Sequence, residues 1–214
     1  MIFLLGICIG SFAKCLADRY PHYLIHARSR CCSCSHVLSA IDLFPILSFV
    51  LLKGRCRYCN AEIPISNIIT EIVFGFLYPV LFIIPISFEL RITTAILMPI
   101  FYLASAADIK HGEIPDLCSA VIVCTAILFS SYYVSTASIA AMLCIFCVRF
   151  GWLGAGDAKL IIAFTLFRGN GILAAMWSAS LVCILFSVLI KNEKRRIPFA
   201  PFLCMGFMLC LLLS

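Results

Sequence analysis

Long apolar runs, separated by short connections that carry most of the charges, limit most strongly what this chain can fold into. Hydrophobic residues make up 64% of the 214 residues, and charged residues only 12%. A soluble domain averages roughly 45–50% apolar and about 25% charged residues, so it could not bury this much apolar surface. Because many of the runs approach the length of a membrane-spanning helix, the sequence predicts an all-α membrane protein.

The apolar runs predict a polytopic bundle of about eight transmembrane helices, with seven as the alternative count. The candidate spans are 1–16, 66–86, 92–107, 117–134, 136–150, 157–168, 171–190 and 198–214. The N-terminal run lacks the basic region and cleavage site of a signal peptide, so we expect it to be a retained first span. The span 157–168 is short, so we expect it to lean on neighbouring helices or to begin in a wet pocket.

The lysines and arginines predict the orientation, because basic residues are retained on the cytoplasmic side of a membrane. With the N-terminus outside, fourteen of the sixteen basic residues fall on inner connections, including the cluster Lys191, Lys194, Arg195 and Arg196. Only Arg91 and Arg168 fall outside. The formal charge of +6 is therefore explained by topology and attraction to anionic lipid, and we expect no nucleic-acid partner.

One connection is long enough to fold by itself, and its composition differs from the rest of the chain. The sequence therefore predicts three parts. Residues 1–16 form the first transmembrane helix, residues 17–65 a cytoplasmic loop, and residues 66–214 the transmembrane core.

Two Cys-x-x-Cys pairs stand within this loop, Cys31 with Cys34 and Cys56 with Cys59, separated by 21 residues. Four thiolates at this spacing can occupy the corners of a tetrahedron, which suits structural zinc and leaves no open position to activate water. A pair of disulfides is the first alternative, although disulfides rarely persist in the cytosol, and unligated thiols are the second. Cys32 could compete for one ligand position.

The ten carboxylates separate into groups by position. Five lie in predicted loops, where a solvated surface role is expected: Asp18, Asp42, Glu62, Glu89 and Glu193. Glu71 lies inside the second span, where a carboxylate is costly. We leave two roles open for Glu71, a hydrogen bond in helix packing and a role in a site.

The remaining four carboxylates form two clusters on the inner side, one with Asp108, Glu113 and Asp116 and the other with Asp157. The topology thus brings Asp108 and Asp157 to the same membrane face. Asp108 ends the third span, and Asp157 begins the sixth, 49 residues later. Two neighbouring carboxylates cannot both ionise easily, so one keeps a proton while the other takes a proton from a shared water. The arrangement predicts general acid–base hydrolysis of a peptide bond. The alternatives are a helix cap for Asp157 and pairing of Asp108 with Lys110 or His111.

Glycine and proline surround both aspartates. Gly154 and Gly156 flank the approach to Asp157, where we expect an unusual backbone turn and close approach of a substrate strand. Pro115 is expected to stop a helix just past Asp108.

Taken in order, these motifs resemble the bacterial type IV prepilin peptidases, which are membrane aspartic proteases of the GxGD class. The similar segments are GSFAKCLADRYP (10–21), the two cysteine pairs, Asp108 with Ile114-Pro115-Asp116, GAGDAKL (154–160) and IPFAPFL (197–203). The resemblance covers nearly the whole chain.

The resemblance implies that Asp108 and Asp157 are catalytic and that the substrates are prepilins or pseudopilins, which lose a short basic leader. It implies a place in the bacterial inner membrane with the active site at the cytoplasmic face. Many members also methylate the new N-terminal amine with S-adenosylmethionine, and the cysteine loop usually accompanies that activity. The residues that would contact this methyl donor stay unassigned.

The chain departs from the family pattern in the region associated with methylation. Lys14 stands where asparagine is common, Cys32 where proline is usual, and Ser66-Asn67-Ile68 where Arg-Tyr-Pro is typical. A peptidase without methyltransferase activity is therefore the alternative function.

Two other classes of protein compete with an enzyme. A transporter predicts carboxylates near the bilayer midplane and repeated halves, whereas these acids sit at span ends and the chain shows no internal repeat. A zinc-stabilised assembly factor predicts that the carboxylates only pair with lysines.

Overall fold

The computed structural model describes residues 1–21, 28–129, 133–168, 171–190 and 198–212. The basic cluster at 191–196, Glu193 and Ile197 therefore lie outside the described residues. Within the described part the regular elements are helices, and two isolated β-bridges lie in the loop between residues 30 and 62. The predicted all-α class is confirmed.

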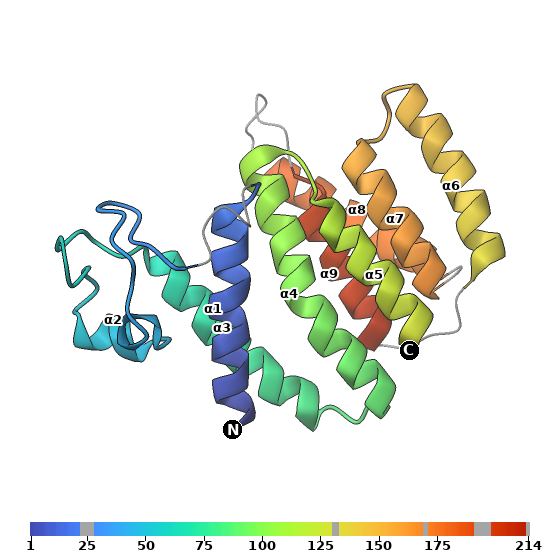
Figure 1. Ribbon diagram of the computed structural model, residues 1–214. Helices are drawn as coiled ribbons and strands as arrows, with labels where there is room; N and C mark the ends of the chain where they lie inside the picture. Colours follow the sequence, from blue (N-terminus) through green and yellow to red (C-terminus); the bar gives the residue numbers. More distant parts are fainter. Residues whose placement is uncertain (22–27, 130–132, 169–170, 191–197, 213–214) are drawn as a thin grey trace. The chain divides into compact units, whose positions relative to one another are not determined.

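Eight helices coincide with the eight apolar runs (Figure 1). They are α1 (Ile2–Arg19), α3 (Ile65–Ile83), α4 (Phe88–His111), α5 (Asp116–Phe129), α6 (Val134–Arg149), α7 (Ala155–Arg168), α8 (Ile172–Ile190) and α9 (Ala200–Leu212). Among the described residues, α3 and α4 are long and apolar enough to cross a membrane, and α5, α6 and α9 are shorter apolar helices. The helices are thus compatible with a helical membrane protein.

The chain divides into two compact units, Met1–Pro85 and Ile86–Ser214. The first unit holds α1, α3 and the connection between them, which carries a short 3₁₀ turn, η1 (Ile41–Leu43), and one short helix, α2 (Leu47–Leu51). The second unit holds α4 to α9.

Glycines allow α1 and α3 to approach each other closely. A Cβ added at Gly6 would lie 2.5 Å from the carbonyl oxygen of Phe74, and one at Gly10 would lie 2.8 Å from the Cβ of Phe74. On the facing helix, a Cβ at Gly75 would lie 2.8 Å from Ile7. Gly6 and Gly10 form the Gly-x-x-x-Gly pattern that lets membrane helices pack backbone to backbone. The pattern is readable in the sequence but was missed there.

Three phenylalanines hold α4, α7 and α9 together in the second unit. The rings of Phe164 and Phe207 stack with centroids 4.0 Å apart, and Phe101 meets both edge-on at 5.6 and 5.9 Å. Edge-to-face and stacked arrangements are the favoured geometries of aromatic pairs. This aromatic layer fixes the relative register of the three helices.

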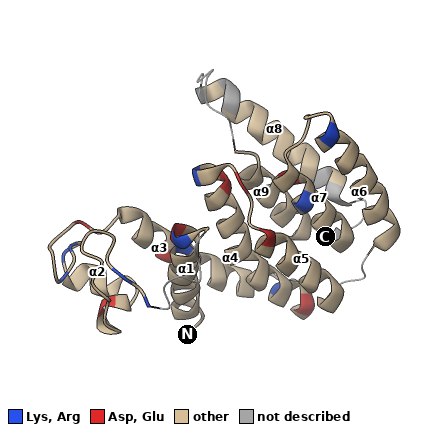
Figure 2. Ribbon diagram, turned by 45° about the horizontal axis from the view of Figure 1, so that its top comes forward, with Lys and Arg blue, Asp and Glu red and all other residues tan. Residues whose placement is uncertain are grey.

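The charged residues of the second unit lie at the helix ends (Figure 2). Helix α4 ends at His111, because Gly112 adopts a left-handed conformation (φ 68°) and its N–H bonds to the carbonyl oxygen of Asp108. The helix thus continues about one turn past Asp108 before Pro115, and the glycine ends it.

Candidate active site and metal centre

The aromatic layer explains how Asp108 and Asp157 come together. Asp108 follows Phe101 by seven residues on α4, and Asp157 precedes Phe164 by seven residues on α7. Seven residues are about two helical turns, or about 10.5 Å, and return to nearly the same helix face. Each carboxylate therefore lies about two turns from the aromatic layer, on the helix face that carries the phenylalanine. They lie close enough for their charges to interact directly.

The same register brings the N-terminus of α9 to Asp108. Ala200 precedes Phe207 by seven residues, and its backbone N–H donates a 3.0 Å hydrogen bond to Oδ2 of Asp108. The carbonyl oxygen of Phe199 accepts the first bonds of α9, so Ala200 is the first helical residue. A helix N-terminus carries a partial positive charge that stabilises a nearby carboxylate. Asp108 is thus held by a helix start.

Asp157 has a different environment, in the first turn of α7. Its Oδ1 atom is buried and has no hydrogen-bond partner among the described residues. A buried polar atom without a partner is costly unless water or a ligand satisfies it. The oxygen is therefore available to a water molecule or a substrate, whereas Oδ2 of Asp108 is already engaged.

The glycines before Asp157 leave room for neighbouring side chains, and their backbone angles are not unusual. A Cβ at Gly154 would lie 3.2 Å from Oδ2 of Asp157, and one at Gly156 would lie 3.1 Å from the Cβ of Ile114. Neither glycine has a positive φ, so the expected unusual turn is wrong, and the left-handed residue of this connection is Gly151 (φ 72°). The close approach at Gly156 is real, but it is made by the chain's own Ile114.

A salt bridge joins the helix starts next to this pair. Lys159 Nζ lies 2.5 Å from Oδ1 of Asp116, which links α7 to the start of α5. The lysine of the GAGDAKL segment thus pairs with Asp116 and leaves Asp157 without a cationic partner of its own on α7.

In the first unit, the four predicted metal ligands form one cluster. The Sγ atoms of Cys31, Cys34, Cys56 and Cys59 all lie within 4.8 Å of one another, and those of Cys31 and Cys59 are 3.8 Å apart. Tetrahedral zinc with Zn–S bonds of about 2.3 Å separates its sulfurs by about 3.8 Å. A disulfide requires about 2.05 Å. The donor set and its spacing therefore fit zinc. Cys32 is exposed and outside the cluster.

The two cysteine turns repeat one backbone design. The N–H of Cys31 bonds to the carbonyl oxygen of His36 and that of Cys56 to Ala61, and each turn closes through a positive-φ residue, Ser35 or Asn60. An isolated β-bridge also closes each turn, and it joins residues seven apart in both, Arg30 to Val37 and Arg55 to Glu62. The shared Arg-Cys-x-x-Cys spacing is thus a short internal repeat, and the expectation that the chain has none was wrong for these two turns.

The thiols of this cluster do not ionise independently. Backbone N–H groups of Cys34 and Ser33, with help from neighbouring thiols, lower the pKa of Cys31 to about 6. The backbone N–H of Ala61 lowers the pKa of Cys59, but burial and the thiols of Cys34, Cys56 and Cys31 outweigh it and raise that pKa to about 12. Four neighbouring thiolates would need a cation, which a metal ion could supply.

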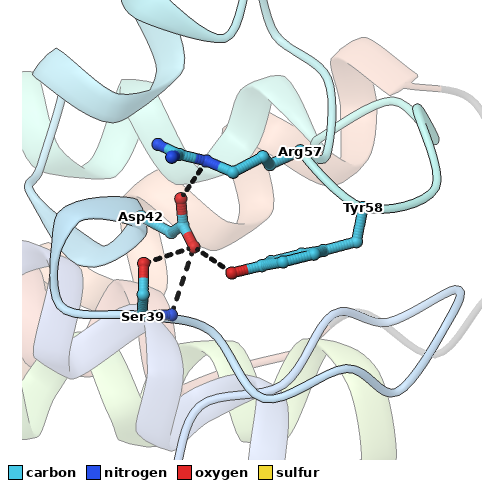
Figure 3. Close-up of polar contacts among 4 residues, drawn as sticks. All are labelled: Ser39, Asp42, Arg57 and Tyr58. Carbon is cyan, nitrogen blue, oxygen red and sulfur yellow. Dashed lines mark hydrogen bonds and ion pairs between the residues drawn. The ribbon is translucent and has the colours of Figure 1, made fainter.

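Asp42 joins the two turns, and the prediction that it is solvated was wrong. Its side chain is only 3% exposed and accepts hydrogen bonds from the N–H (3.1 Å) and hydroxyl (2.7 Å) of Ser39 and from the hydroxyl of Tyr58 (3.1 Å), as Figure 3 shows. Nε of Arg57 lies 2.9 Å from its Oδ1. The rings of His36 and Tyr58 lie against each other at a tilt of 32°, with centroids 3.7 Å apart, and add a second link between the turns.

We expect Asp42→Asn to loosen this loop by about 1–3 kcal/mol at pH 7, because buried hydrogen bonds to a charged group are lost. The hydrogen bonds from Ser39 and Tyr58 and the charge of Arg57 lower the pKa of Asp42. Its stabilisation is therefore complete above about pH 4 and is lost as the pH falls through the lowered folded-state pKa. Hydrogen exchange of the 39–58 amides would measure the difference.

The control for this prediction is Asp18→Asn. Asp18 pairs with Lys14 on the surface of α1, and exposed pairs contribute little. Equal exchange in the wild-type protein and Asp42→Asn at pH 7 would contradict a structural role for Asp42.

Glu71 makes a hydrogen bond that packs α3 against the loop, and a role for it in a site stays a prediction. It is buried in α3, and its Oε2 accepts a 2.8 Å hydrogen bond from the backbone N–H of Ile46, in the loop, instead of from another helix. Ile46 adopts φ 60° and ψ −51°, a conformation that is rare for a β-branched residue. Glu71 thus anchors the loop at a strained position.

Comparisons with known proteins agree with the division into two units. The bacterial peptidase A24 N-terminal domain matches residues 4–84, and the type IV leader peptidase family matches residues 95–192. Each range falls inside one compact unit, Met1–Pro85 or Ile86–Ser214. Together the two matches cover most of the chain.

Similar curated proteins come from several bacteria. The prepilin leader peptidase/N-methyltransferase of Bacillus subtilis is 29% identical over 231 residues, covering 99% of this chain and 93% of that protein. The type 4 prepilin-like proteins leader peptide-processing enzyme of Escherichia coli O78:H11 is 24% identical, covering 94% and 88%. A Myxococcus xanthus prepilin leader peptidase/N-methyltransferase is 37% identical over 79 residues, 36% of this chain and 24% of that protein. No solved structure matches. The chain belongs to the type IV leader peptidase family.

Proposed function

We propose that this protein cleaves the leader peptide of type IV prepilins or pseudopilins with Asp108 and Asp157 as its catalytic pair. The single observation that carries the proposal is the pairing of the two carboxylates at the ends of α4 and α7, with one oxygen of Asp157 left unbonded within the described part. The family match and the names of the relatives supply the reaction and the substrate class.

The unequal environments of the two aspartates assign different roles to them. The N-terminus of α9 holds Asp108 in its charged form, so Asp108 takes a proton from the water as its oxygen adds to the scissile carbonyl carbon. Asp157, buried beside that charge, carries the shared proton and donates it to the carbonyl oxygen. As the tetrahedral intermediate collapses and the C–N bond breaks, Asp108 gives its proton to the leaving amine and a hydroxyl of the intermediate returns a proton to Asp157.

We expect Ala200→Pro to reduce leader cleavage about 10- to 100-fold, the effect of losing one hydrogen bond to a charged group. Proline lacks the N–H that Ala200 donates to Asp108, yet it is tolerated at the first position of a helix. The matched control is Ala200→Ser, which keeps the N–H and should retain near wild-type rates. Equal rates for the proline and serine variants would show that this hydrogen bond does not position Asp108.

The position of the site in the membrane determines which substrates can reach it in this proposal. With eight spans and the N-terminus outside, as the distribution of basic residues predicts, the aspartate pair would lie at the cytoplasmic face of the inner membrane. A prepilin that lies across the bilayer with its leader in the cytosol reaches such a site, whereas a soluble chain has poor access. The partners are thus the prepilin and the lipid bilayer, with no nucleic acid.

Zinc has a structural role in this proposal. The thiolates of Cys31, Cys34, Cys56 and Cys59 would hold the ion and close all four tetrahedral positions. The ion would therefore brace the loop, with Asp42 joining the same two turns beside it, and hydrolysis would depend on the aspartates alone.

Methyl transfer is the second proposed activity, supported by the names of the relatives and by the match to the N-terminal domain over residues 4–84. S-adenosylmethionine would supply the methyl group. The acceptor would be the new N-terminal amine, which would gain the methyl group and release one proton while the C–S electron pair stays on sulfur. The alternative, a peptidase without this activity, rests on the departures at Lys14, Cys32 and 66–68.

One experiment separates these possibilities. The purified, zinc-loaded protein in detergent is incubated with a prepilin and isotopically labelled S-adenosylmethionine, and the products are weighed by mass spectrometry. Loss of the leader together with gain of the label supports both activities. Loss of the leader without gain of the label contradicts methyl transfer. If the leader is not lost and no label is gained, the enzyme proposal is contradicted.

A further inference from the structure

Neither the aspartate pair nor the cysteine cluster accounts for an exposed apolar segment in the loop of the first unit. Within residues 41–51, six large apolar side chains are between 44% and 66% exposed: Ile41, Leu43, Phe44, Leu47, Val50 and Leu51. They belong to η1, α2 and the turn between them. Exposed apolar side chains that gather in this way mark a surface for a partner or for a membrane.

The segment carries no exposed acidic side chain. Its only acidic residue is Asp42, whose side chain is 3% exposed and bonded to Ser39, Arg57 and Tyr58. Lys53, just beyond the segment, is exposed. A lysine beside apolar side chains suits the headgroup layer of a bilayer that contains anionic lipid.

A hydrogen bond to α3 sets the depth of the segment. Helix α3 has 19 residues, or about 28 Å, and a hydrocarbon core is about 30 Å thick, so nearly all of α3 is needed to cross it. Glu71 lies six residues into α3, about 9 Å along its axis. Its Oε2 accepts the 2.8 Å bond from the N–H of Ile46, in the middle of the segment. Even a glutamate side chain directed toward the helix start spans only about one turn, so Ile46 lies inside the start of α3, at the outer edge of the acyl chains.

We propose that residues 41–51 form a membrane-docking surface, which inserts its exposed apolar side chains into one leaflet of the bilayer beside α3. Interfacial helices bury their apolar faces by about 5–10 Å, which matches the depth set by Glu71. The contacts of Asp42 and the cysteine turns hold α2 in shape, because five helical residues are not stable by themselves. The loop is thus seated on the membrane and is not a free cytosolic domain. This inference rests on α3 crossing the bilayer and is independent of methyl transfer and of cleavage.

The test measures the depth of a tryptophan placed in the segment. The two native tryptophans, Trp152 and Trp177, are replaced by phenylalanine, and Phe44→Trp or Val50→Trp then provides the single fluorophore. The full-length, zinc-loaded protein is reconstituted into vesicles of phosphatidylcholine and phosphatidylglycerol, and its fluorescence is recorded with brominated acyl chains in the lipid or with acrylamide in the water. The tryptophan at either position should lose most of its emission to the bromines and little of it to acrylamide.

Ser33→Trp in the same background is the matched control, because Ser33 is exposed in the first cysteine turn and lies outside the segment. This tryptophan should show the opposite pattern, with strong quenching by acrylamide. Zinc content and circular dichroism equal to those of the wild-type protein show that each variant is folded.

Quenching by acrylamide without quenching by the lipid, at positions 44 and 50, overturns the proposal. Equal quenching by the lipid at position 33 also overturns it, because the segment would then have no membrane face of its own. Protection from acrylamide that appears only when a prepilin is added assigns the surface to the substrate, and this result likewise contradicts docking to lipid.

Discussion

Asp157→Asn is expected to reduce leader cleavage about 100- to 10,000-fold, the usual contribution of a positioned acid or base. Asparagine keeps the size of the side chain, but it can neither carry nor give up the shared proton. Because Oδ1 of Asp157 makes no hydrogen bond with a described residue, the substitution breaks no structural contact of that atom. The loss should therefore appear in the maximal rate of cleavage, measured with a purified prepilin in detergent, and not in the stability of the protein.

Asp116→Asn provides the control at the same end of the helices. The Asp116 side chain is 80% exposed and pairs with Lys159, so its loss should change the cleavage rate by less than a few-fold. Zinc content should be the same in both variants, since the metal centre belongs to the other unit. Substantial cleavage by folded Asp157→Asn would remove this residue from the catalytic pair.

Replacing Cys56 by serine is expected to remove bound zinc almost completely and to expose the loop around it to proteolysis. Cys56 is the most buried of the four ligands, at 5% exposure, and three thiols cannot close the tetrahedron. Structural zinc binds with an apparent free energy of about 10–16 kcal/mol, much of which acts as folding energy. Metal analysis and limited proteolysis of the purified protein would measure both effects.

Cys32→Ser is the matched control for this second prediction. Cys32 stands next to Cys31 but is exposed and outside the cluster, so zinc content should remain at one ion per chain. A similar loss of zinc in Cys32→Ser would mean that Cys32 competes as a ligand, contrary to the geometry. Full zinc content in Cys56→Ser would contradict the four-cysteine centre itself.

The helices and the shared end of the two aspartates could be predicted because both follow from the lengths of the apolar runs. A run fixes where a helix lies, and the number of runs between Asp108 and Asp157 places them at the same face. The cysteine cluster was predictable for a similar reason, since short turns with fixed spacing determine their own geometry.

The hydrogen bond from Ala200 to Asp108 could not be predicted, because any non-proline residue offers a backbone N–H. The only sequence signal was the pair of prolines, Pro198 and Pro201, around the start of α9, which is typical of a helix N-terminus. The prolines do not show that this helix start lies next to Asp108. That position depends on the aromatic layer, which joins segments far apart in the chain.

Asp42 was misjudged because a polar residue in a loop is usually solvated. Its burial depends on Arg57 and Tyr58, which approach it only once the two cysteine turns have formed around a common centre. Long-range contacts of this kind leave no periodic pattern in the sequence.

The most direct test of the aspartate pair compares cleavage by Asp108→Asn, by Asp157→Asn and by the variant with both changes, under single-turnover conditions with excess enzyme. Groups that act together on one water lose their joint contribution when either is removed. The proposal predicts that the double variant cleaves as slowly as each single variant, within about threefold. Near wild-type cleavage by either single variant, or losses that multiply in the double variant, would contradict a shared catalytic water.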